Sequence, residues 1–283
     1  MKKMKNEKQH QSRPGVEEKM RPVPQTEPIA YSKKGKLFGK IALITGGDSG
    51  IGKAIALLFA KEGAHIAIAY LNEEIDALAT KKEVENYNRE CLLIKGDLSN
   101  ETNCLIAVEK TIDNFKQIDI VVNNAALHWE SESLEKISSE QLSKTFQNNV
   151  FSYFWITKYA LLHMKKGGSI INTTSVTAYR GSPKLIDYAA TKGAIVSFTR
   201  SLSSNLMARG IRVNAVAPGP VWTPLIVSSF DSEKVANFGT DSPMKRAGMP
   251  NEIAPSFLFL ACDDSQFISG QVLHPNGGEI ING

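Results

Sequence analysis

The chain has 283 residues, of which 42% are hydrophobic and 22% are charged, a composition typical of a soluble globular protein with one substantial core. No run approaches the roughly 20 apolar residues of a membrane-spanning helix, so no membrane partner is expected. The three cysteines lack Cys-x-x-Cys spacing and the five histidines are scattered. This pattern argues against a metal site and for a reducing compartment, the cytoplasm.

Residues 1–36 differ in composition and charge from the rest of the chain. They hold ten Lys or Arg and four Asp or Glu, a balance of +6 that leaves residues 37–283 at −2, although the whole chain carries +4. A polar segment broken by four prolines cannot bury enough apolar surface to order itself, so we expect a basic N-terminal arm that is at least partly disordered. The alternative is that residues 28–31 dock on the domain or on a neighbouring subunit. The domain of residues 37–283 has no basic excess, so nucleic acid is not an expected partner.

The domain opens with a strand, a glycine-rich turn and a helix. The apolar run at residues 41–44 leads into Thr-Gly-Gly-Asp-Ser-Gly-Ile-Gly at residues 45–52, and Ile51, Ile55 and Leu58 then recur at helical spacing. Glycines let a backbone approach a pyrophosphate, and a helix N-terminus offers it free N–H groups. This context favours a dinucleotide-binding site.

Apolar runs and amphipathic segments alternate through the rest of the domain. Strands are expected at residues 41–44, 66–70, 91–94, 118–122, 169–172, 211–217 and 271–274. After the first helix, further helices are expected at residues 73–88, 101–115, 139–164, 188–207 and 252–261. The alternation predicts an α/β fold, a single-domain, Rossmann-like, doubly wound sheet of seven parallel strands with helices on both faces. The long irregular stretch at about residues 223–250 is expected to be a lid or substrate loop.

Polar clusters follow the predicted strands, where ligands of such sheets bind. They are the glycine turn at residues 46–52, Asp97, Asn123 with Asn124, Ser175, and Pro218 with Gly219. This recurrence predicts one site along the carboxyl edge of the sheet.

Tyr188 and Lys192 are four residues apart, so on a helix they share a face. A phenol titrates near pH ~10, and a neighbouring positive charge favours its ionised form. The pair is therefore a candidate proton donor and acceptor. An isolated Tyr-x-x-x-Lys is more often an ordinary surface pair. The remaining motifs decide between a surface pair and a proton-transfer pair.

With these motifs in order, residues 38–283 resemble the short-chain dehydrogenase/reductase family. The matching features are the turn at residues 45–52, Asp97, Asn123-Asn-Ala-Ala126, Asn149, Ser175, Tyr188-x-x-x-Lys192, Asn214 and Pro218-Gly219. The thirteen-residue step from Ser175 to Tyr188 also matches. The N-terminal arm and the segments 185–192 and 218–225 resemble the bacterial glucose/ribitol dehydrogenase-like branch of the family.

The resemblance implies a catalytic set of Asn149, Ser175, Tyr188 and Lys192, and no metal. Tyr188 would exchange a proton with the substrate oxygen while hydride moves between the substrate carbon and the nicotinamide. Lys192 would lower the pKa of the phenol and hold the nicotinamide ribose. Ser175 would hydrogen-bond the substrate oxygen, and Asn149 would fix a water that links Lys192 to solvent.

The resemblance also implies NAD(H) or NADP(H) as cofactor. The expected cofactor-binding residues are Gly46, Ser49, Gly50, Ile51, Gly52, Tyr70, Leu71, Asn72, Asp97, Leu98, Asn123, Ala125, Tyr188, Lys192, Pro218, Gly219, Val221 and Thr223. An acidic residue at the end of the second strand usually marks NAD preference, and Tyr70 stands there instead. The cations that usually mark NADP preference are replaced by Ser49 and Leu71. Use of both NAD(H) and NADP(H) stays open, and the sequence favours NAD(H).

The expected reaction is the interconversion of an alcohol and a carbonyl in a small molecule such as a sugar, polyol, aldehyde or ketone. His128, Trp129, Tyr179 and Trp222 offer a mixed aromatic and polar lining for such a substrate. The family resemblance implies a homotetramer, with a dimer as the alternative. Two other functions are weighed: a 3-oxoacyl thioester reductase, which would need a basic patch for an acidic carrier, and a dinucleotide-binding regulatory protein without turnover.

Overall fold

The computed structural model describes residues 7–281 and divides the chain into two units, one ending at Tyr31 and the other beginning at Ser32. In the first unit, the Gln9 side chain donates to the Arg21 carbonyl at 2.6 Å and accepts from the Arg21 N–H at 2.9 Å. This unit also holds a short 3-10 helix, η1 (Glu17–Lys19). Residues 1–6 of the predicted arm lie outside the described residues.

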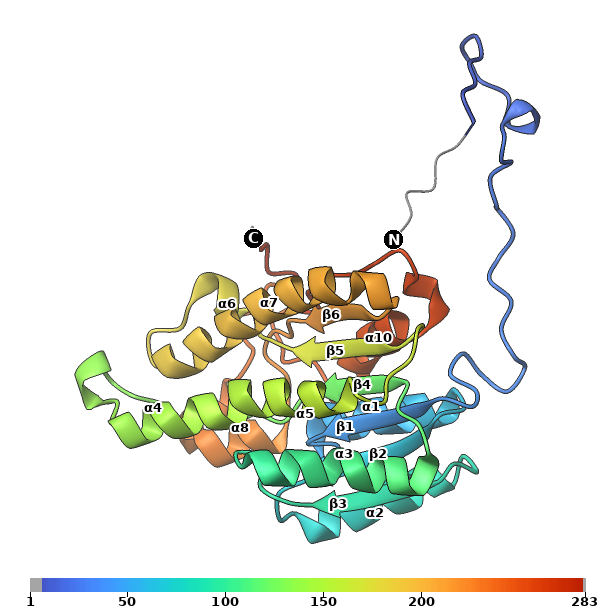
Figure 1. Ribbon diagram of the computed structural model, residues 1–283. Helices are drawn as coiled ribbons and strands as arrows, with labels where there is room; N and C mark the ends of the chain where they lie inside the picture. Colours follow the sequence, from blue (N-terminus) through green and yellow to red (C-terminus); the bar gives the residue numbers. More distant parts are fainter. Residues whose placement is uncertain (1–6, 282–283) are drawn as a thin grey trace. The chain divides into compact units, whose positions relative to one another are not determined.

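The second unit is built on a parallel sheet with the strand order β3-β2-β1-β4-β5-β6-β7, which confirms the predicted doubly wound, seven-stranded fold (Figure 1). The strands are β1 (Ile41–Thr45), β2 (His65–Tyr70), β3 (Cys91–Lys95), β4 (Ile120–Asn123), β5 (Ser169–Thr173), β6 (Arg212–Val216) and β7 (Val272–Leu273). Strands β1 and β4 are buried at every position, as their uninterrupted apolar sequences require. The order reverses between β1 and β4, and this is where ligands bind to such sheets.

Helices cover both faces of the sheet. They are α1 (Gly50–Lys61), α2 (Glu74–Glu85), α3 (Glu101–Phe115), α4 (Ser139–Phe146), α5 (Ser152–Ala160), α6 (Thr177–Arg180), α7 (Ile186–Leu206), α8 (Pro224–Ser229), α9 (Ser232–Ala236) and α10 (Pro250–Ala261). On one face α1 packs against α2 and α10, and on the other α3 packs against α5, beside α7 (Figure 1). The main core cluster joins this second layer to the sheet and includes Val108, Ile156 and Val121.

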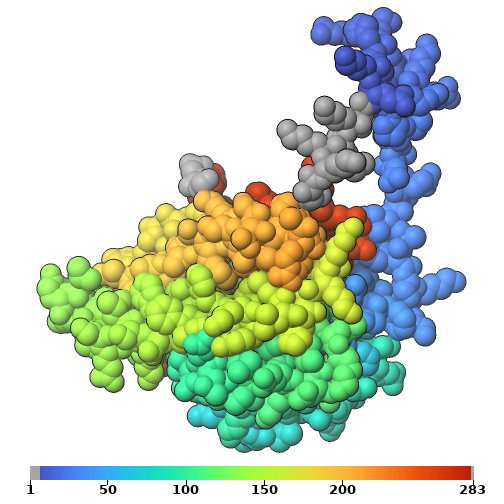
Figure 2. All heavy atoms as spheres, in the orientation of Figure 1, coloured from blue at the N-terminus to red at the C-terminus, as the bar shows by residue number. Residues whose placement is uncertain are grey.

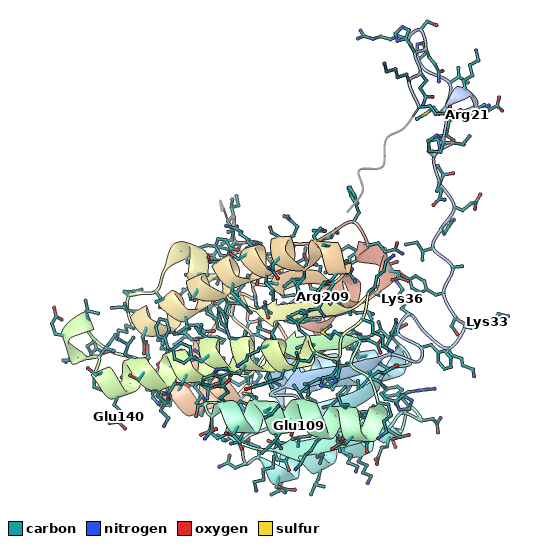
Figure 3. All side chains as sticks on the ribbon, in the orientation of Figure 1. Arg21, Lys33, Lys36, Glu109, Glu140 and Arg209 are labelled. Carbon is teal, nitrogen blue, oxygen red and sulfur yellow. The ribbon has the colours of Figure 1, made fainter. Side chains whose placement is uncertain are left out.

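Hydrogen bonds from Arg209 connect the end of α7 to the end of α5. Arg209 (labelled in Figure 3) closes the 3-10 turn η4 (Met207–Arg209) and donates to the carbonyls of Leu161 at 2.6 Å and Met164 at 3.3 Å. It thereby links the C-terminal end of α7 to the residues that follow α5.

Two predicted stretches differ from the observed structure. The helical region expected at residues 139–164 consists of α4 and α5 joined by a π-helical turn, Gln147–Phe151, which holds the buried side chain of Asn149. The stretch at residues 223–250 is not wholly irregular, since it contains the short helices α8 and α9. Helices of five or six residues are too short for their periodicity to be recognised in a sequence.

Candidate active site

A cavity of about 660 Å³ opens at the carboxyl ends of the strands. It is lined by residues that follow each of β1 to β6, as the placement of the polar clusters predicts. The predicted site residues on its wall are Gly46, Ser49, Gly50, Ile51, Tyr70, Leu71, Asp97, Leu98, Ala125, Ser175, Tyr188, Lys192, Pro218, Gly219, Val221 and Thr223. The two halves of the expected site therefore share one cavity.

The glycine turn has the backbone that a dinucleotide requires. Gly46 and Gly50 have positive φ values of 61° and 52°, which side-chain-bearing residues rarely adopt. A Cβ at Gly52 would lie 1.9 Å from the Gly46 carbonyl oxygen, so only glycine lets α1 approach the turn this closely. The Ser49 side chain makes no cap hydrogen bond, and the first N–H groups of α1 are left for a ligand. The turn thus fits a pyrophosphate.

Asn124 holds the glycine turn in place. Its Nδ2 donates to the carbonyls of Thr45 and Gly46, each at 3.2 Å, and its main-chain N–H donates to the Thr45 hydroxyl at 2.9 Å. The end of β4 thereby fixes the loop that follows β1.

The end of the cavity beside β2 and β3 is acidic. Tyr70 is buried and its hydroxyl donates to Glu74 at 3.0 Å, while Asp48, Glu73 and Asp76 line the wall. Burial raises the pKa of Asp48, and the nearby carboxylates of Glu73 and Asp76 act in the same direction. The cations among the lining residues, Arg180, Lys192 and Lys234, follow β5 and β6 instead. This end therefore favours the ribose hydroxyls over a phosphate on electrostatic grounds.

Asp97 lines the cavity, and its own carboxylate also shapes the loop after β3. Its Oδ1 accepts from the Ser99 N–H at 2.9 Å, an Asx turn that leads into α3. Asp97 can therefore shape this loop and still face a cofactor in the cavity, as the resemblance implies.

Helix α7 carries the predicted acid/base pair in its first two turns. The Lys192 amine is fully buried and donates to the Thr173 carbonyl at 2.9 Å, and it lies 5.5 Å from the ring centroids of both Tyr188 and Tyr153. The start of α7 is fixed by the buried carboxylate of Asp187, which accepts from the Tyr188 N–H at 2.9 Å and from the Thr145 hydroxyl at 2.8 Å. Lys192 and Tyr188 therefore sit in defined positions at the cavity wall.

Burial dominates the protonation of this pair. It raises the pKa of Tyr188 to about 12, and a hydrogen bond with the Ser175 side chain opposes the rise. Burial also lowers the pKa of Lys192 to about 7. The sequence predicted a phenol pKa lowered by the lysine; in the free protein the direction is the opposite, because both groups lie in a poorly solvated site.

Ser175 lies where the resemblance predicts, next to Tyr188 and largely buried. Its Oγ accepts from the Thr177 N–H at 3.2 Å. This contact begins α6 and orients the hydroxyl beside the phenol.

Asn149 is fully buried in the π-helical turn and does not line the cavity. Its Oδ1 accepts from the Leu127 N–H and its Nδ2 donates to the Leu127 carbonyl, both at 2.8 Å. Nδ2 also lies 3.3 Å from the Thr191 hydroxyl. Its observed partners fix the loop after β4, which the proton-relay expectation did not include.

Three expected cofactor contacts lie away from the cavity wall. Asn123 is fully buried in the sheet and donates to the Thr157 hydroxyl at 3.0 Å and to Asn172 at 2.9 Å. Gly52 faces the glycine turn from within α1. Asn72 is exposed and does not line the cavity, although its neighbours Leu71 and Glu73 do. Asn123 and Gly52 serve packing in the free protein, and all three stay predicted cofactor contacts.

The wall opposite the glycine turn holds residues that the sequence did not single out as a group. His128 is buried, with its ring centroid 5.1 Å from that of Tyr188 and 5.3 Å from that of Phe230. Lys234 of α9 pairs with Glu130 and lies 4.0 Å above the Phe230 ring. The pairing joins α9 to the loop after β4; since the partners are 104 residues apart, no local sequence signal could have revealed it.

Two other kinds of site, a membrane-spanning helix and a metal site, are absent from the described part of the chain. Residues 7–281 contain no helix long and apolar enough to cross a bilayer. Over the same residues, no group of three or more His, Cys, Asp or Glu side chains is placed to hold a metal ion.

Comparisons with known proteins agree with this geometry. Residues 46–279 match a family model described as Enoyl-(Acyl carrier protein) reductase. NADPH-dependent aldehyde reductase 1, a chloroplastic protein of Arabidopsis thaliana, is 52% identical over 99% of this chain and 100% of its own length. The glucose and ribitol dehydrogenase of Daucus carota is 50% identical over 96% of this chain and 96% of its own.

The fold comparison gives the same result. A crystal structure of a short chain dehydrogenase from Burkholderia cenocepacia in complex with NADP has a TM-score of 0.81 and 31% identity, covering 86% of this chain and 98% of that one. The chain is thus an enzyme, an oxidoreductase that uses NAD(H) or NADP(H). It belongs to the short-chain dehydrogenase/reductase family.

Proposed function

We propose that this enzyme reduces a small carbonyl compound to its alcohol, and catalyses the reverse reaction, with Tyr188 as the general acid and base. The observation that carries the proposal is that Tyr188, Lys192 and Ser175 share one cavity with a glycine turn suited to a dinucleotide. A bound nicotinamide supplies or accepts the hydride. The residues of the chain then have to bind and polarise the substrate oxygen and move one proton.

The protonation state of Tyr188 suits a proton donor. Because its pKa is raised to about 12, Tyr188 holds its proton across the neutral range and can donate it from Oη to the substrate oxygen as the carbonyl π bond breaks. The Ser175 hydroxyl can hydrogen-bond the same oxygen and stabilise the charge that develops there. Lys192, buried beside the phenol with its pKa lowered to about 7, can return a proton to Tyr188 after the reaction.

For the cofactor we propose NADP(H). The lean of the sequence towards NAD(H) is not supported by the relatives, one of which is named as NADPH-dependent and another of which was solved with NADP. Tyr70, in place of a carboxylate, leaves the end of β2 without the residue that usually excludes a 2′-phosphate. The lining carboxylates Asp48, Glu73 and Asp76 work against that phosphate, so we expect the preference for NADPH over NADH to be modest, on the order of tenfold.

Fluorescence titration with NADPH and NADH tests the cofactor proposal. Glu73→Gln should tighten NADPH binding by roughly twofold to fivefold, because it removes a negative charge near the phosphate, with a smaller effect on NADH. Glu85→Gln, which removes the same charge at the C-terminal end of α2 and away from the cavity lining, is the matched control. Tighter binding of NADH than NADPH to the wild type would contradict the proposal.

The reaction is tested by following nicotinamide absorbance with a panel of aldehydes, ketones, sugars, polyols and acyl thioesters. We expect turnover with small carbonyl compounds and their alcohols. The acidic balance of the domain offers no basic patch for an acidic carrier, so thioesters should be poor substrates. Turnover of thioesters alone would favour a 3-oxoacyl thioester reductase, and cofactor binding without any turnover would favour a regulatory protein.

We further propose that the chain forms a homo-oligomer and works in a reducing compartment such as the cytoplasm. The support for the first is an exposed aromatic face on α5 and α7, where Phe154 is 48% exposed and stacks on Phe198 at 4.0 Å. The support for the second is that Cys91, Cys104 and Cys262 are all free and buried.

A further inference from the structure

His128 is a polar side chain beside Tyr188 whose hydrogen bonding the protein leaves incomplete. The residue is 6% exposed, lines the cavity, and lies between the rings of Tyr188 and Phe230. Its Nδ1 is buried and has no hydrogen-bond partner among the described residues. A buried polar atom without a partner costs about 1–3 kcal/mol, and most such atoms in native proteins are satisfied. A partner from outside the chain is therefore the natural completion of this side chain.

The surroundings hold His128 in place without satisfying it. The residue before it, Leu127, is bonded through both main-chain groups to Asn149, each at 2.8 Å. Two residues after it, Glu130 pairs with Lys234 of the lid. The polar side chains of Asn149 and Glu130 are thus bonded to other groups. The imidazole of His128 is held in position and stays available to a molecule in the cavity.

The imidazole is uncharged. Burial lowers the pKa of His128 to about 4, and the positive charges of Lys192 and Lys234 act in the same direction. A neutral imidazole has one donor and one acceptor nitrogen, and its two tautomers allow Nδ1 to serve as either. An alcohol hydroxyl, itself both donor and acceptor, is the matching partner, whereas a carboxylate would match a charged imidazolium.

We propose that His128 is a substrate-positioning residue that hydrogen-bonds a hydroxyl group on the carbon next to the reacting carbon. The preferred substrates are then α-hydroxy carbonyl compounds and the corresponding vicinal diols. This inference rests on the proposed carbonyl reduction. Tyr188 takes the reacting oxygen, and His128 lies beside it, with the two ring centroids 5.1 Å apart, so we assign the second oxygen to the adjacent carbon. The remaining wall, with Phe230 and Phe238 at 6.1 Å, suits the carbon chain.

The test compares hydroxyacetone with butanone, two ketones that differ by a hydroxyl in place of a methyl group. The wild type should show a higher kcat/KM for hydroxyacetone. His128→Phe keeps the ring but removes both nitrogens, and it should lower the ratio of the two kcat/KM values by roughly tenfold to a hundredfold, mainly through the KM for hydroxyacetone. His128→Gln keeps a donor and an acceptor and should restore part of the ratio.

The outcomes separate this inference from the proposed function. Turnover of both ketones with a ratio that His128→Phe leaves unchanged would overturn the role of His128 while the carbonyl reduction stands. Turnover of neither ketone by the wild type would overturn both. NADPH titration of each variant checks that the cofactor half of the cavity is intact, and should His128→Phe fail to fold, the ratio for His128→Gln against that for His128→Ala decides.

Discussion

The chemistry of this site depends on how deeply two side chains of α7 are buried. The i, i+4 spacing of Tyr188 and Lys192 could be recognised in the sequence, and so could their proximity to the cofactor motifs. Burial could not, because it depends on Tyr153 and Thr173, which come from α5 and β5. The lysine therefore loses much of the charge that was expected to lower the pKa of the phenol.

Lys192 should make the stability of the free enzyme depend on pH. In the unfolded chain its amine keeps a proton up to its ordinary pKa of 10.5, whereas in the folded enzyme the amine loses it above about 7. Between these values the unfolded state binds more protons, so the wild type gains stability as pH rises. The free energy of unfolding of the wild type minus that of Lys192→Met should increase from pH 7 to pH 10 and stay level below pH 7.

Urea denaturation of both proteins at each pH measures this difference, and the subtraction removes the contributions of most other titrating groups. A difference that is constant across pH 6–10 would mean that Lys192 is solvated and charged in the free enzyme.

At the scale of elements, the predicted strands and long helices fall within a few residues of the observed ones, since apolar runs and helical periodicity are local properties. The π-helical turn between α4 and α5 is different. It depends on Asn149 reaching the main chain of Leu127, 22 residues away, and nothing local marks it. The lid helices α8 and α9 were missed for their shortness, and their tie to the loop after β4 is again a long-range pairing, Lys234 with Glu130.

Asn149→Ala should destabilise the protein by about 1–3 kcal/mol, because both main-chain groups of Leu127 lose a side-chain partner. It should also lower kcat/KM, since Leu127 positions the loop that holds His128. Gln147→Ala, at an exposed position in the same π-helical turn, should change stability by less than about 0.5 kcal/mol.

Urea denaturation and steady-state kinetics on the two variants check these effects. Equal stability of Asn149→Ala and Gln147→Ala would show that the turn does not depend on the buried amide.

At the scale of the whole molecule, the visible face in Figure 2 brings together α5 and α7. Phe151 of the π-helical turn and Phe154 of α5 are 44% and 48% exposed, and a concentration of apolar surface in a globular protein usually marks a protein contact. Composition and periodicity could not reveal this face, because it combines residues from two helices that are distant in sequence. We also propose that residues 1–36 form a basic arm ahead of the catalytic domain at residues 37–283.

Phe154→Lys should shift the protein to a smaller species in light scattering coupled to size exclusion, because a charge would be buried in the proposed contact. Ile75→Lys removes an apolar side chain that is 84% exposed on α2 and should leave the size unchanged. A monomeric wild type would refute the proposed contact.

In the proposed mechanism, Tyr188 passes the proton, and the cofactor half of the cavity binds NADPH without help from the Tyr188 hydroxyl. Tyr188→Phe removes one hydroxyl and keeps the ring that contacts His128. We predict that carbonyl reduction by this variant, measured in a single turnover with NADPH, falls by about 10²–10⁴-fold while the NADPH dissociation constant stays within a factor of two or so of the wild type. Reduction at a rate close to that of the wild type would contradict the account.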